Sequence, residues 1–580
     1  MHLTHRAVAG TRSRRTLLAG IAVLALGATA ACDTANATDR PEPPVKGGTL
    51  NLVLGTKIEN MDPQKIQTAT DANISRLFTR TLTTFKSDPG PAASEIVGDL
   101  ATDTGRPSEG NTVWDFTLKK DVKWQDGNPV TCTQIKYGVE RNFSALFDGG
   151  LTGYARSMLK NNAVAYEGPF KGDNNNGKGL ESVQCVDETT IRFRLNNPVG
   201  DFGYTVALPI FAPVPLDKDQ DKAAYDRSPF SSGPYKIVES TEAKLVLERN
   251  PFWIQRTDLV RKAYPDRIVA TVNANAPQVS YAIIQDQGDA ASSVQLDLDV
   301  ASNFVQQVVN DDDLSKRLIQ GSFSGVRFLA INTRRVKDVR CRQALVFAAN
   351  KRKFRSAMGG SMFGDLATSA ITPSLRSHKE FDLYNTKSKP EGDRERARAL
   401  LTEAGNACPA KIRLAFPESR RRLVATIAES FQLAGIETEL VGVDTSKVDY
   451  FRDAIGKPNN DFDVMWAGWI ADWANGSSVV PPLFEGATIP KGADANGNTN
   501  FSLLDDPTIN AEIDAARKES DITAQYRMWG EIDQKIMESG AMIPLIYMRA
   551  LRMVGTNIRG AFIHPQYGQP DVTAMGLARP

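Results

Sequence analysis

Alternation of apolar and polar residues predicts strands in the first half of the chain. This period of two is typical of half-buried strands, and it occurs over residues 49–54, 113–118 and 190–195. Between the last two, Thr131 can cap a helix that carries Ile135, Val139 and Phe143 on one face. Two further strands joined by a turn are expected over residues 231–253. This part of the chain is therefore predicted to mix α and β structure.

The second half alternates strand and helix patterns. Residues 411–416 and 436–441 are expected to be strands, and the helix between them has an apolar face that consists of Leu423, Ile427, Phe431 and Ala434. A strand–helix–strand unit joins parallel strands, so we expect a mostly parallel sheet with covering helices. The other elements expected here are strands at 326–331 and 543–547 and helices at 338–349, 391–404 and 523–537.

One stretch, DFDVMWAGWIADWAN at residues 461–475, gathers three tryptophans around a glycine and an acid, namely Trp466, Trp469, Trp473, Gly468 and Asp472. Residues 461–469 are expected to form a strand, which puts the tryptophans at its carboxyl end. Open α/β sheets bind ligands at that end. Aromatic walls around one fixed charge suit a ligand pocket. The alternative is a strand end at which the tryptophans only fill the core.

Length and charge narrow the class of protein. At 580 residues the chain exceeds the size of a single core, so two or three domains are expected. Residues 1–31 contain four arginines and no acid, so the formal charge falls from +1 to −3 without them. No basic stripe remains, and we expect no nucleic-acid partner.

Catalytic and metal chemistry have little support in the sequence. The chain has four histidines, and His2 and His5 lie in the segment expected to be removed, which leaves His378 and His564 far apart. Neither GxSxG nor HExxH occurs. We therefore expect no catalytic residues, no metal and no cofactor, and the chain is not expected to be an enzyme. A secreted hydrolase is the alternative from another class.

The N-terminus has the pattern of an export signal over residues 1–31. Its apolar run, residues 17–31, follows basic residues and is too short to span a bilayer. Residues 28–32, ATAAC, resemble a lipoprotein signal junction, with Thr29 where Leu is usual, so Cys32 is expected to carry the lipid. The paired Arg14 and Arg15 resemble a twin-arginine signal. An ordinary cleaved signal that leaves Cys32 in a tail is the alternative.

Residues 32–46 are polar and contain proline, and we expect them to tether the folded part to a membrane. The protein would then lie outside the cytoplasm, lipid-anchored at the outer face of the cell membrane.

Four further cysteines suggest disulfides in an exported chain: Cys132, Cys185, Cys341 and Cys408. No CxxC motif occurs, and four cysteines allow three pairings. We favour Cys132–Cys185 and Cys341–Cys408, because each pair falls within one expected domain. Free buried thiols are the alternative.

Five sequence blocks, in this order, resemble the extracytoplasmic solute-binding proteins of ABC transporters in the peptide and nickel-binding family, family 5. They are WDFTL with VKWQDGNPVT at 114–118 and 122–131, SGPY at 232–235, RNPFW at 249–253, NT with VRCRQAL at 332–333 and 339–345, and AGW with Asp472 at 467–469. The resemblance extends from about residue 47 to about residue 560, nearly the whole exported chain.

The resemblance implies an α/β protein with a two-lobed periplasmic-binding-protein-like fold and an extra α+β domain inserted in the first lobe. Lobe one would comprise residues 47–85, 205–318 and 544–580, with the inserted domain at 86–204. Lobe two would span residues 319–543. The chain would cross between the lobes twice, and the crossings would act as hinges.

The resemblance also implies a site. Asp472 would pair with the α-ammonium group of a peptide, and the backbone around Ala467, Gly468 and Trp469 would bond the peptide as an added strand. The opposite side would be lined by a lobe-one strand that consists of Gln67, Thr68, Ala69 and Thr70.

Two positions depart from the family pattern. Trp466, which we also place in the site, stands where some oligopeptide binders have a basic residue for the ligand carboxylate. Ala330 stands where such binders can have an acid.

The function implied is a tethered receptor, expected to be a monomer, that binds peptides between its lobes and delivers them to an ABC permease. A non-peptide solute, such as a sugar, an opine or a metal chelate, is the alternative within this class.

Overall fold

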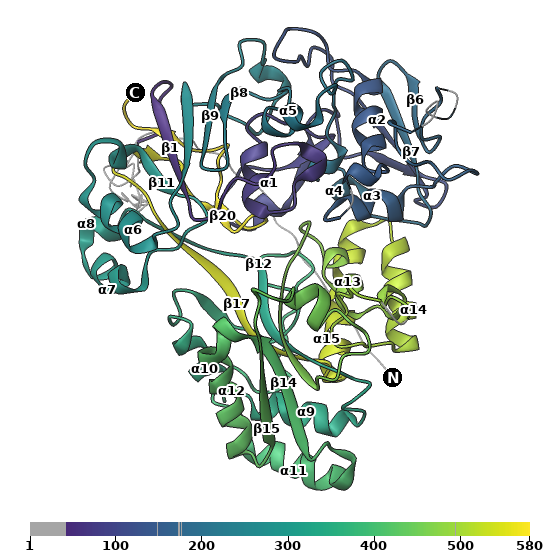
Figure 1. The fold of residues 1–580 in the computed structure, drawn as a ribbon, viewed down its shortest axis with the longest axis vertical. Coiled ribbons are helices and arrows are strands. Elements are labelled where there is room, and N and C mark those ends of the chain that lie inside the picture. Colours follow the sequence, from purple (N-terminus) through teal and green to yellow (C-terminus); the bar gives the residue numbers. More distant parts are fainter. Residues whose placement is uncertain (1–41, 148, 172–174, 176, 493–494) are drawn as a thin grey trace, which may run out of the picture. The chain divides into compact units, whose positions relative to one another are not determined.

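The computed structural model describes residues 42–147, 149–171, 175, 177–492 and 495–580. The expected signal, residues 1–31, and the expected lipid site, Cys32, lie outside the described residues. Residues 43–580 form one compact unit, and the description below concerns this unit (Figure 1).

A five-stranded mixed sheet opens the folded part, in the order β11-β1-β10-β9-β8. The apolar residues of β1 alternate with half-buried polar ones, as the period of two predicts. Helices α6, Ala276–Gln285, and α7, Ser302–Asn310, lie near one edge. The strands are β1, Thr49–Leu54; β8, Tyr235–Ser240; β9, Lys244–Arg249; β10, Arg267–Val272; and β11, Ser293–Gln295.

A separate four-stranded antiparallel sheet lies within residues 106–194, in the order β4-β5-β7-β6. Helix α2, Cys132–Arg141, begins at a capping box in which Thr131 and Gln134 exchange side-chain and backbone hydrogen bonds. Helix α3 is Thr152–Met158. The strands are β4, Arg106–Ser108; β5, Val113–Thr117; β6, Val183–Asp187; and β7, Thr190–Arg194.

The largest sheet has six strands in the order β13-β17-β12-β16-β14-β15. Its strands are β12, Leu318–Ile331; β13, Gly364–Leu366; β14, Lys411–Pro417; β15, Glu437–Val443; β16, Val464–Ile470; and β17, Met542–Met553.

The expectation of a mostly parallel sheet is wrong for this region. The strand–helix–strand unit does pair β14 with β15 in parallel, and β14 also pairs in parallel with β16. The β12·β16, β12·β17 and β13·β17 pairs are antiparallel. A strand–helix–strand pattern determines only the relative direction of the two strands that it connects. Strands β12 and β17 come from distant parts of the chain, and their direction relative to their neighbours is not contained in that pattern.

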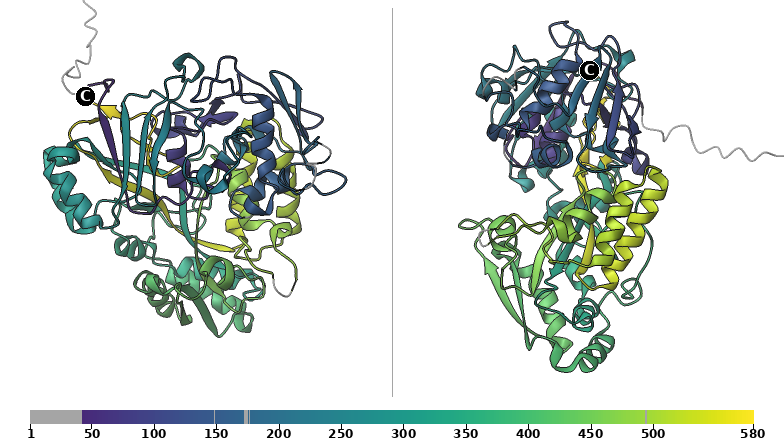
Figure 2. Two further views of the ribbon diagram at one scale, coloured as in Figure 1. Left: turned by 45° about the horizontal axis from the view of Figure 1, so that its top comes forward. Right: turned by 90° about the vertical axis from the view of Figure 1, so that its right-hand side faces the viewer.

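Several helices pack against the six-stranded sheet: α9 and α10 contact β17, and α12 contacts β14 and β15. Asp338 caps α9 by accepting from the Arg340 N–H, and α12 ends just before Gly435, whose φ of +89° suits glycine. Helices α14 and α15 pack against each other, and Figure 2 shows them side by side. These helices are α9, Val339–Ala348; α10, Lys351–Ala357; α11, Arg394–Ala404; α12, Arg421–Leu433; α14, Pro507–Lys518; and α15, Ile522–Glu538.

The remaining elements are short. The helices are α1, Ala69–Ser75; α4, Phe202–Thr205; α5, Lys222–Arg227; α8, Asp312–Ser315; and α13, Val480–Phe484. The strand pairs are β2, Thr83–Phe85, with β3, Ile96–Gly98; β18, Ile558–Arg559, with β21, Gly576–Leu577; and β19, Ile563–His564, with β20, Gln569–Pro570.

Strands β12 and β17 connect the two larger sheets. They pair along nearly their whole length, with a register shift between Ser322 and Val326 that divides the ladder into two parts and a second shift between Arg327 and Phe328. Beyond the shift, the Val300 N–H donates to the Leu551 carbonyl, which holds the far end of β17 near β11 (Figure 1). We propose that the chain divides into two lobes and an inserted domain at the bounds expected from the sequence. The separate sheets and this two-stranded crossing support the division.

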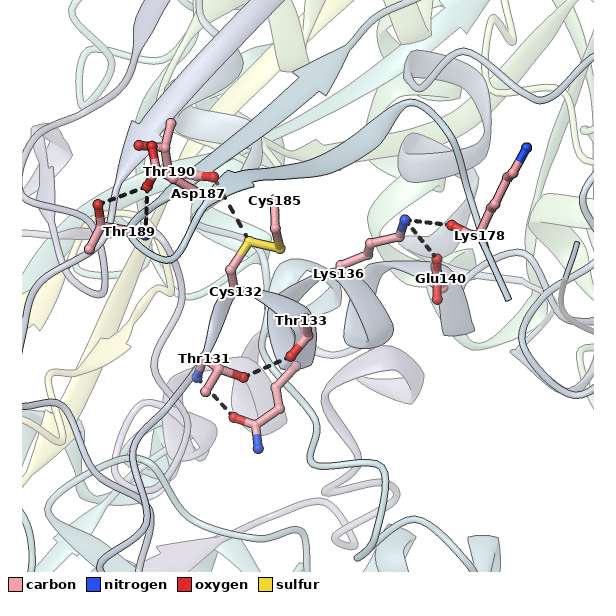
Figure 3. The surroundings of a disulfide bond; sticks show 11 residues. Thr131, Cys132, Thr133, Lys136, Glu140, Lys178, Cys185, Asp187, Thr189 and Thr190 are labelled. Atoms are coloured by element: carbon pink, nitrogen blue, oxygen red, sulfur yellow. Dashed lines mark hydrogen bonds and ion pairs between the residues drawn. A yellow bond between two sulfur atoms is a disulfide. The ribbon is translucent and has the colours of Figure 1, made fainter. Parts of the chain in front are cut away.

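Two disulfides lie in separate parts of the structure. Cys132 at the start of α2 is bonded to Cys185 of β6 (Figure 3), and Cys341 of α9 is bonded to Cys408 just before β14. These are the two pairs favoured from the sequence. Beside the first, Lys136 Nζ lies 3.7 Å from a Glu140 carboxylate oxygen.

Candidate functional site

A cavity of about 190 Å³ lies where segments from distant parts of the chain meet. Its wall combines the start of α1, the region around α3, the end of β16 and the C-terminal segment. This volume is below the roughly 300–1,000 Å³ of a drug-sized ligand pocket, so it suits one end of an extended ligand. The lining residues are Gln67, Thr68, Ala69, Ala72, Phe85, Leu151, Ala207, Leu208, Pro209, Ile470, Ala471, Asp472, Gln566 and Tyr567.

Asp472 places a carboxyl group in this cavity. Its Oδ2 accepts a hydrogen bond of 2.5 Å from the hydroxyl of Tyr154 in α3, and among the described residues it has no cation within ion-pair distance. Burial raises the pKa of Asp472 to about 6, although the Tyr154 hydrogen bond acts in the opposite direction. The cavity therefore presents an acid that a cation would stabilise in its charged form.

The strand that leads to Asp472 has one open edge. Strand β12 pairs with β16 from Val464 to Ile470, whereas β14 pairs with β16 only at Val464 and Met465. Where β14 diverges, the Tyr450 hydroxyl lies 3.0 Å from the carbonyl oxygens of both Ala415 and Trp466. Residues 466–470 thus have a strand on one side only.

Backbone direction along β16 alternates, so the groups at this open edge can be identified. The Ala471 N–H donates to the carbonyl of Ser324 in β12, whereas the Trp466 carbonyl points to the other side. By the alternation of an antiparallel strand, the N–H and C=O groups of Gly468 and Ile470 also point to the open edge. They are available to an added strand.

The three tryptophans have different surroundings. The Trp466 side chain is buried against Phe354 and does not line the cavity. Trp469 is half-buried, and its Nε1 donates to the Ser478 carbonyl. Trp473 is buried, and its ring meets the Tyr154 ring edge-on at 5.0 Å between centroids. Trp473 therefore supports the site through Tyr154.

The expected lobe-one strand at residues 67–70 is wrong, because the chain forms a helix there. Thr68 is the N-cap of α1, and its Oγ1 accepts from the Asp71 N–H. Gln67, Thr68 and Ala69 nevertheless line the cavity. Thr70 is buried behind them, and its hydroxyl bonds Asp297 and Gln569.

Tyr154 is a site residue that the sequence reasoning missed, and so are Gln566 and Tyr567. Gln566 donates through Nε2 to the Ala471 carbonyl, next to Asp472. Tyr154 precedes Asp472 by 318 residues, and the C-terminal residues lie nearly a hundred residues beyond it. No local pattern marks any of them.

Region 86–204 also contacts the segment just after Asp472. Asp201 is buried, and its Oδ2 accepts from Trp473 Nε1 at 3.1 Å, from Asn475 Nδ2 at 2.8 Å and from the Ser477 hydroxyl. The Tyr204 hydroxyl lies 2.7 Å from that of Tyr526 in α15. These bonds hold the cavity wall together from two sides.

Metal and membrane features are absent from the described part of the chain. No group of three or more His, Cys, Asp and Glu side chains there could hold a metal ion. Within the same residues, no helix has the length and apolar character needed to cross a membrane.

Comparison with known proteins gives one family. Residues 95–491 match "Bacterial extracellular solute-binding proteins, family 5 Middle". The chain is 24% identical over 525 residues to the periplasmic oligopeptide-binding protein OppA of Salmonella typhimurium, a match that covers 86% of this chain and 87% of OppA.

Solved structures show the same likeness. The clavulanic acid biosynthesis oligopeptide binding protein 2 has a TM-score of 0.83 and 31% identity, over 92% of this chain and 96% of that one. DppA from Helicobacter pylori, in complex with the peptide STSA, has a TM-score of 0.66 and 19% identity, over 92% of this chain and 99% of that one. At 19% identity, the second likeness shows the fold alone.

Proposed function

Because the chain belongs to the bacterial extracellular solute-binding proteins of family 5, we propose that it is a receptor for peptides. It has the two-lobed α/β fold of periplasmic binding proteins, and it is a solute-binding protein rather than an enzyme. Relatives named as oligopeptide-binding proteins support a peptide over a sugar, an opine or a metal chelate.

The observation that carries the proposal is the position of Asp472. Within the described residues this acid has no cation beside it, and it stands in a small cavity at the end of a strand whose edge is open. A peptide supplies both missing partners, because its α-ammonium group pairs with the carboxylate and its backbone bonds an open strand edge.

The peptide would lie along the open edge of β16. Its backbone would bond Gly468 and Ile470, and its first residue would enter the cavity. Backbone bonds are common to all peptides, so this mode favours broad specificity. Gln67, Thr68 and Ala69 would face the ligand from the start of α1. Trp469 would support the strand, and the buried Trp466 side chain would pack under the strand without contacting the cavity.

Delivery to an ABC permease completes the proposed role. A lipid on Cys32 and the tether up to residue 46 would hold the receptor, as a monomer, at the outer face of the membrane near that permease. The lipoprotein-like junction at residues 28–32 supports this part.

The test is calorimetric titration of the purified protein with tetra-alanine. We expect the wild type to bind, and Asp472→Ala to weaken binding by roughly 2–5 kcal/mol, the usual cost of removing one partner of a buried charge pair. Asp88→Asn removes an exposed acid elsewhere and serves as the control. Unchanged affinity in Asp472→Ala would remove Asp472 from the site, and absence of wild-type binding to peptides of any length would exclude the peptide ligand.

A further inference from the structure

Arg327 lies in β12 directly opposite Gly468 of β16. Residues that face each other across an antiparallel pair have side chains on the same face of the sheet. The Arg327 guanidinium carbon is 5.2 Å from the centroid of the ring of Trp466, which precedes Gly468 by two residues in β16. Arg327 therefore lies beside the part of β16 that has one open edge.

Gly468 provides the space that this guanidinium occupies. A Cβ atom at Gly468 would lie 2.4 Å from Arg327 Nη1 and 2.9 Å from Cζ. The absence of a side chain allows the guanidinium to lie across the strand at a residue whose backbone groups face the open edge.

Within the described part of the chain, Arg327 has no acid beside it. It has no ion-pair or hydrogen-bond partner there, and its guanidinium lies over the Trp466 ring. Burial, together with the positive charge of Arg420 just before α12, lowers the pKa of Arg327 to about 10. The Arg327 side chain is half-buried and therefore keeps part of its surface in contact with solvent. A partly desolvated cation without an anion is costly, and a bound anion would offset this cost.

We propose that Arg327 binds a carboxylate of the ligand and makes the receptor select peptides that carry one at a fixed distance from the ammonium group. The proposal rests on the proposed function, because Asp472 would bind the ammonium end of the same peptide. A guanidinium and a carboxylate match in charge and in hydrogen-bond geometry.

The spacing of the two charges predicts the ligand length. Gly468 and Asp472 are four residues apart, and a strand rises about 3.3 Å per residue, so the two ends are separated by about 13 Å. A peptide with its ammonium at Asp472 would run antiparallel to β16 and reach Arg327 with about its fourth residue. The carboxylate is then either the C-terminus of a tetrapeptide or an acidic side chain at that position.

The experiment compares three peptides by calorimetry: tetra-alanine, its C-terminal amide, and the amide of Ala-Ala-Ala-Glu. We expect the wild type to bind tetra-alanine about 10- to 100-fold more tightly than the amide, the usual range for a charged hydrogen bond. Arg327→Gln should reduce tetra-alanine binding to the level of the amide and leave the amide unchanged. The amide of Ala-Ala-Ala-Glu tests whether a side-chain carboxylate can replace the C-terminal one. If it binds the wild type more tightly than the tetra-alanine amide does, and loses this advantage in Arg327→Gln, Arg327 also binds side-chain carboxylates.

Arg422→Gln is the matched control, because Arg422 is an exposed arginine of α12. Equal wild-type affinity for tetra-alanine and its amide, with the Asp472 dependence intact, would overturn the role of Arg327 and leave the proposed function standing. A loss for both ligands in Arg327→Gln would show a structural role and overturn it too. If the wild type binds no peptide, the proposed function fails along with this inference.

Discussion

At the scale of single residues, the candidate site contains charged groups that have no opposite charge beside them among the residues that the structure describes. Asp472 has a hydroxyl as its partner, and Arg327 has an aromatic face. Each arrangement tolerates the charge less well than an ion pair does, because a neutral partner offsets only part of the cost of burial. A ligand with matching charges would improve both environments at once.

Peptide affinity should fall in acid because the pKa of Asp472 is about 6. Only the ionised carboxyl attracts an ammonium group, so the association constant should drop about tenfold per pH unit below 6. Titrations with tetra-alanine between pH 7.5 and pH 4.5 measure this. Asp472→Asn should remove the dependence, and a wild-type affinity that is constant over this range would contradict the assignment.

The same pKa affects stability with a definite sign. The folded value of about 6 lies above the ordinary value of 3.8, so the folded protein binds the proton more tightly. The contribution of Asp472 to the free energy of unfolding therefore falls as pH rises from about 4 to about 6. Burial also raises the pKa values of Asp71 and Asp533 to about 6, so the pH dependence of stability combines several groups. The pH dependence of peptide affinity therefore reports more specifically on Asp472.

At the scale of elements, β16 combines two roles through its alternating geometry. One set of its backbone groups bonds β12, and the other set is open beyond Met465. Its side chains have different surroundings as well, since Trp466 packs into the core while Ile470, at the end of the strand, lines the cavity. A strand with this arrangement can bind a ligand without losing its place in the sheet.

The disulfides should stabilise the two regions in which they lie. Their cysteines are 53 and 67 residues apart in sequence, and closing loops of this length stabilises a fold by about 2–4 kcal/mol each. We expect the pair Cys132→Ser and Cys185→Ser, and separately Cys341→Ser and Cys408→Ser, to lower the urea midpoint of unfolding. Reduction of the wild type should reproduce the combined loss, and unchanged midpoints in both double variants would contradict this role.

At the scale of the whole molecule, the arrangement of the cavity depends on bonds between distant regions. Asp201 accepts from three side chains that follow Asp472, and the Tyr204–Tyr526 hydrogen bond lies nearby. Burial raises the pKa of Asp201, and its three donors oppose that effect. These contacts join region 86–204 to the region around α15, so they belong to an arrangement in which the ligand end is enclosed.

Asp201→Ala should favour a more open molecule. The change removes an acceptor shared by three side chains, although Trp473 Nε1 also donates to the Ser477 hydroxyl and Asn475 Nδ2 also donates to Gln525. Loss of the hydrogen bonds to this carboxylate should cost about 1–3 kcal/mol in the enclosed arrangement only. We expect a larger radius of gyration by small-angle X-ray scattering without ligand, and a peptide affinity reduced by about 5- to 100-fold as the competent population falls. Saturating peptide should restore the wild-type radius.

Tyr526→Phe serves as the comparison for Asp201→Ala, because it removes one hydroxyl and should have a smaller effect. An unchanged radius and affinity in Asp201→Ala would show that these bonds do not control opening.

The sequence by itself determined most elements, because their causes are local. Alternation over residues 49–54 and 190–194, the cap at Thr131 and the stop at Gly435 depend on neighbours within a few positions. Family membership was equally readable from short blocks, and the family match confirms it. Asp472 could be singled out as the candidate acid, since the tryptophan-rich stretch is local too.

Only the tertiary structure decided how these pieces meet. It made the largest sheet mixed, turned residues 69–75 into a helix, and placed Trp466 in the core. It brought Tyr154 to Asp472 across 318 positions and placed Arg327 opposite Gly468. The physical reason is that strand pairing and charge compensation depend on which distant segments become neighbours, and a linear pattern does not contain that information.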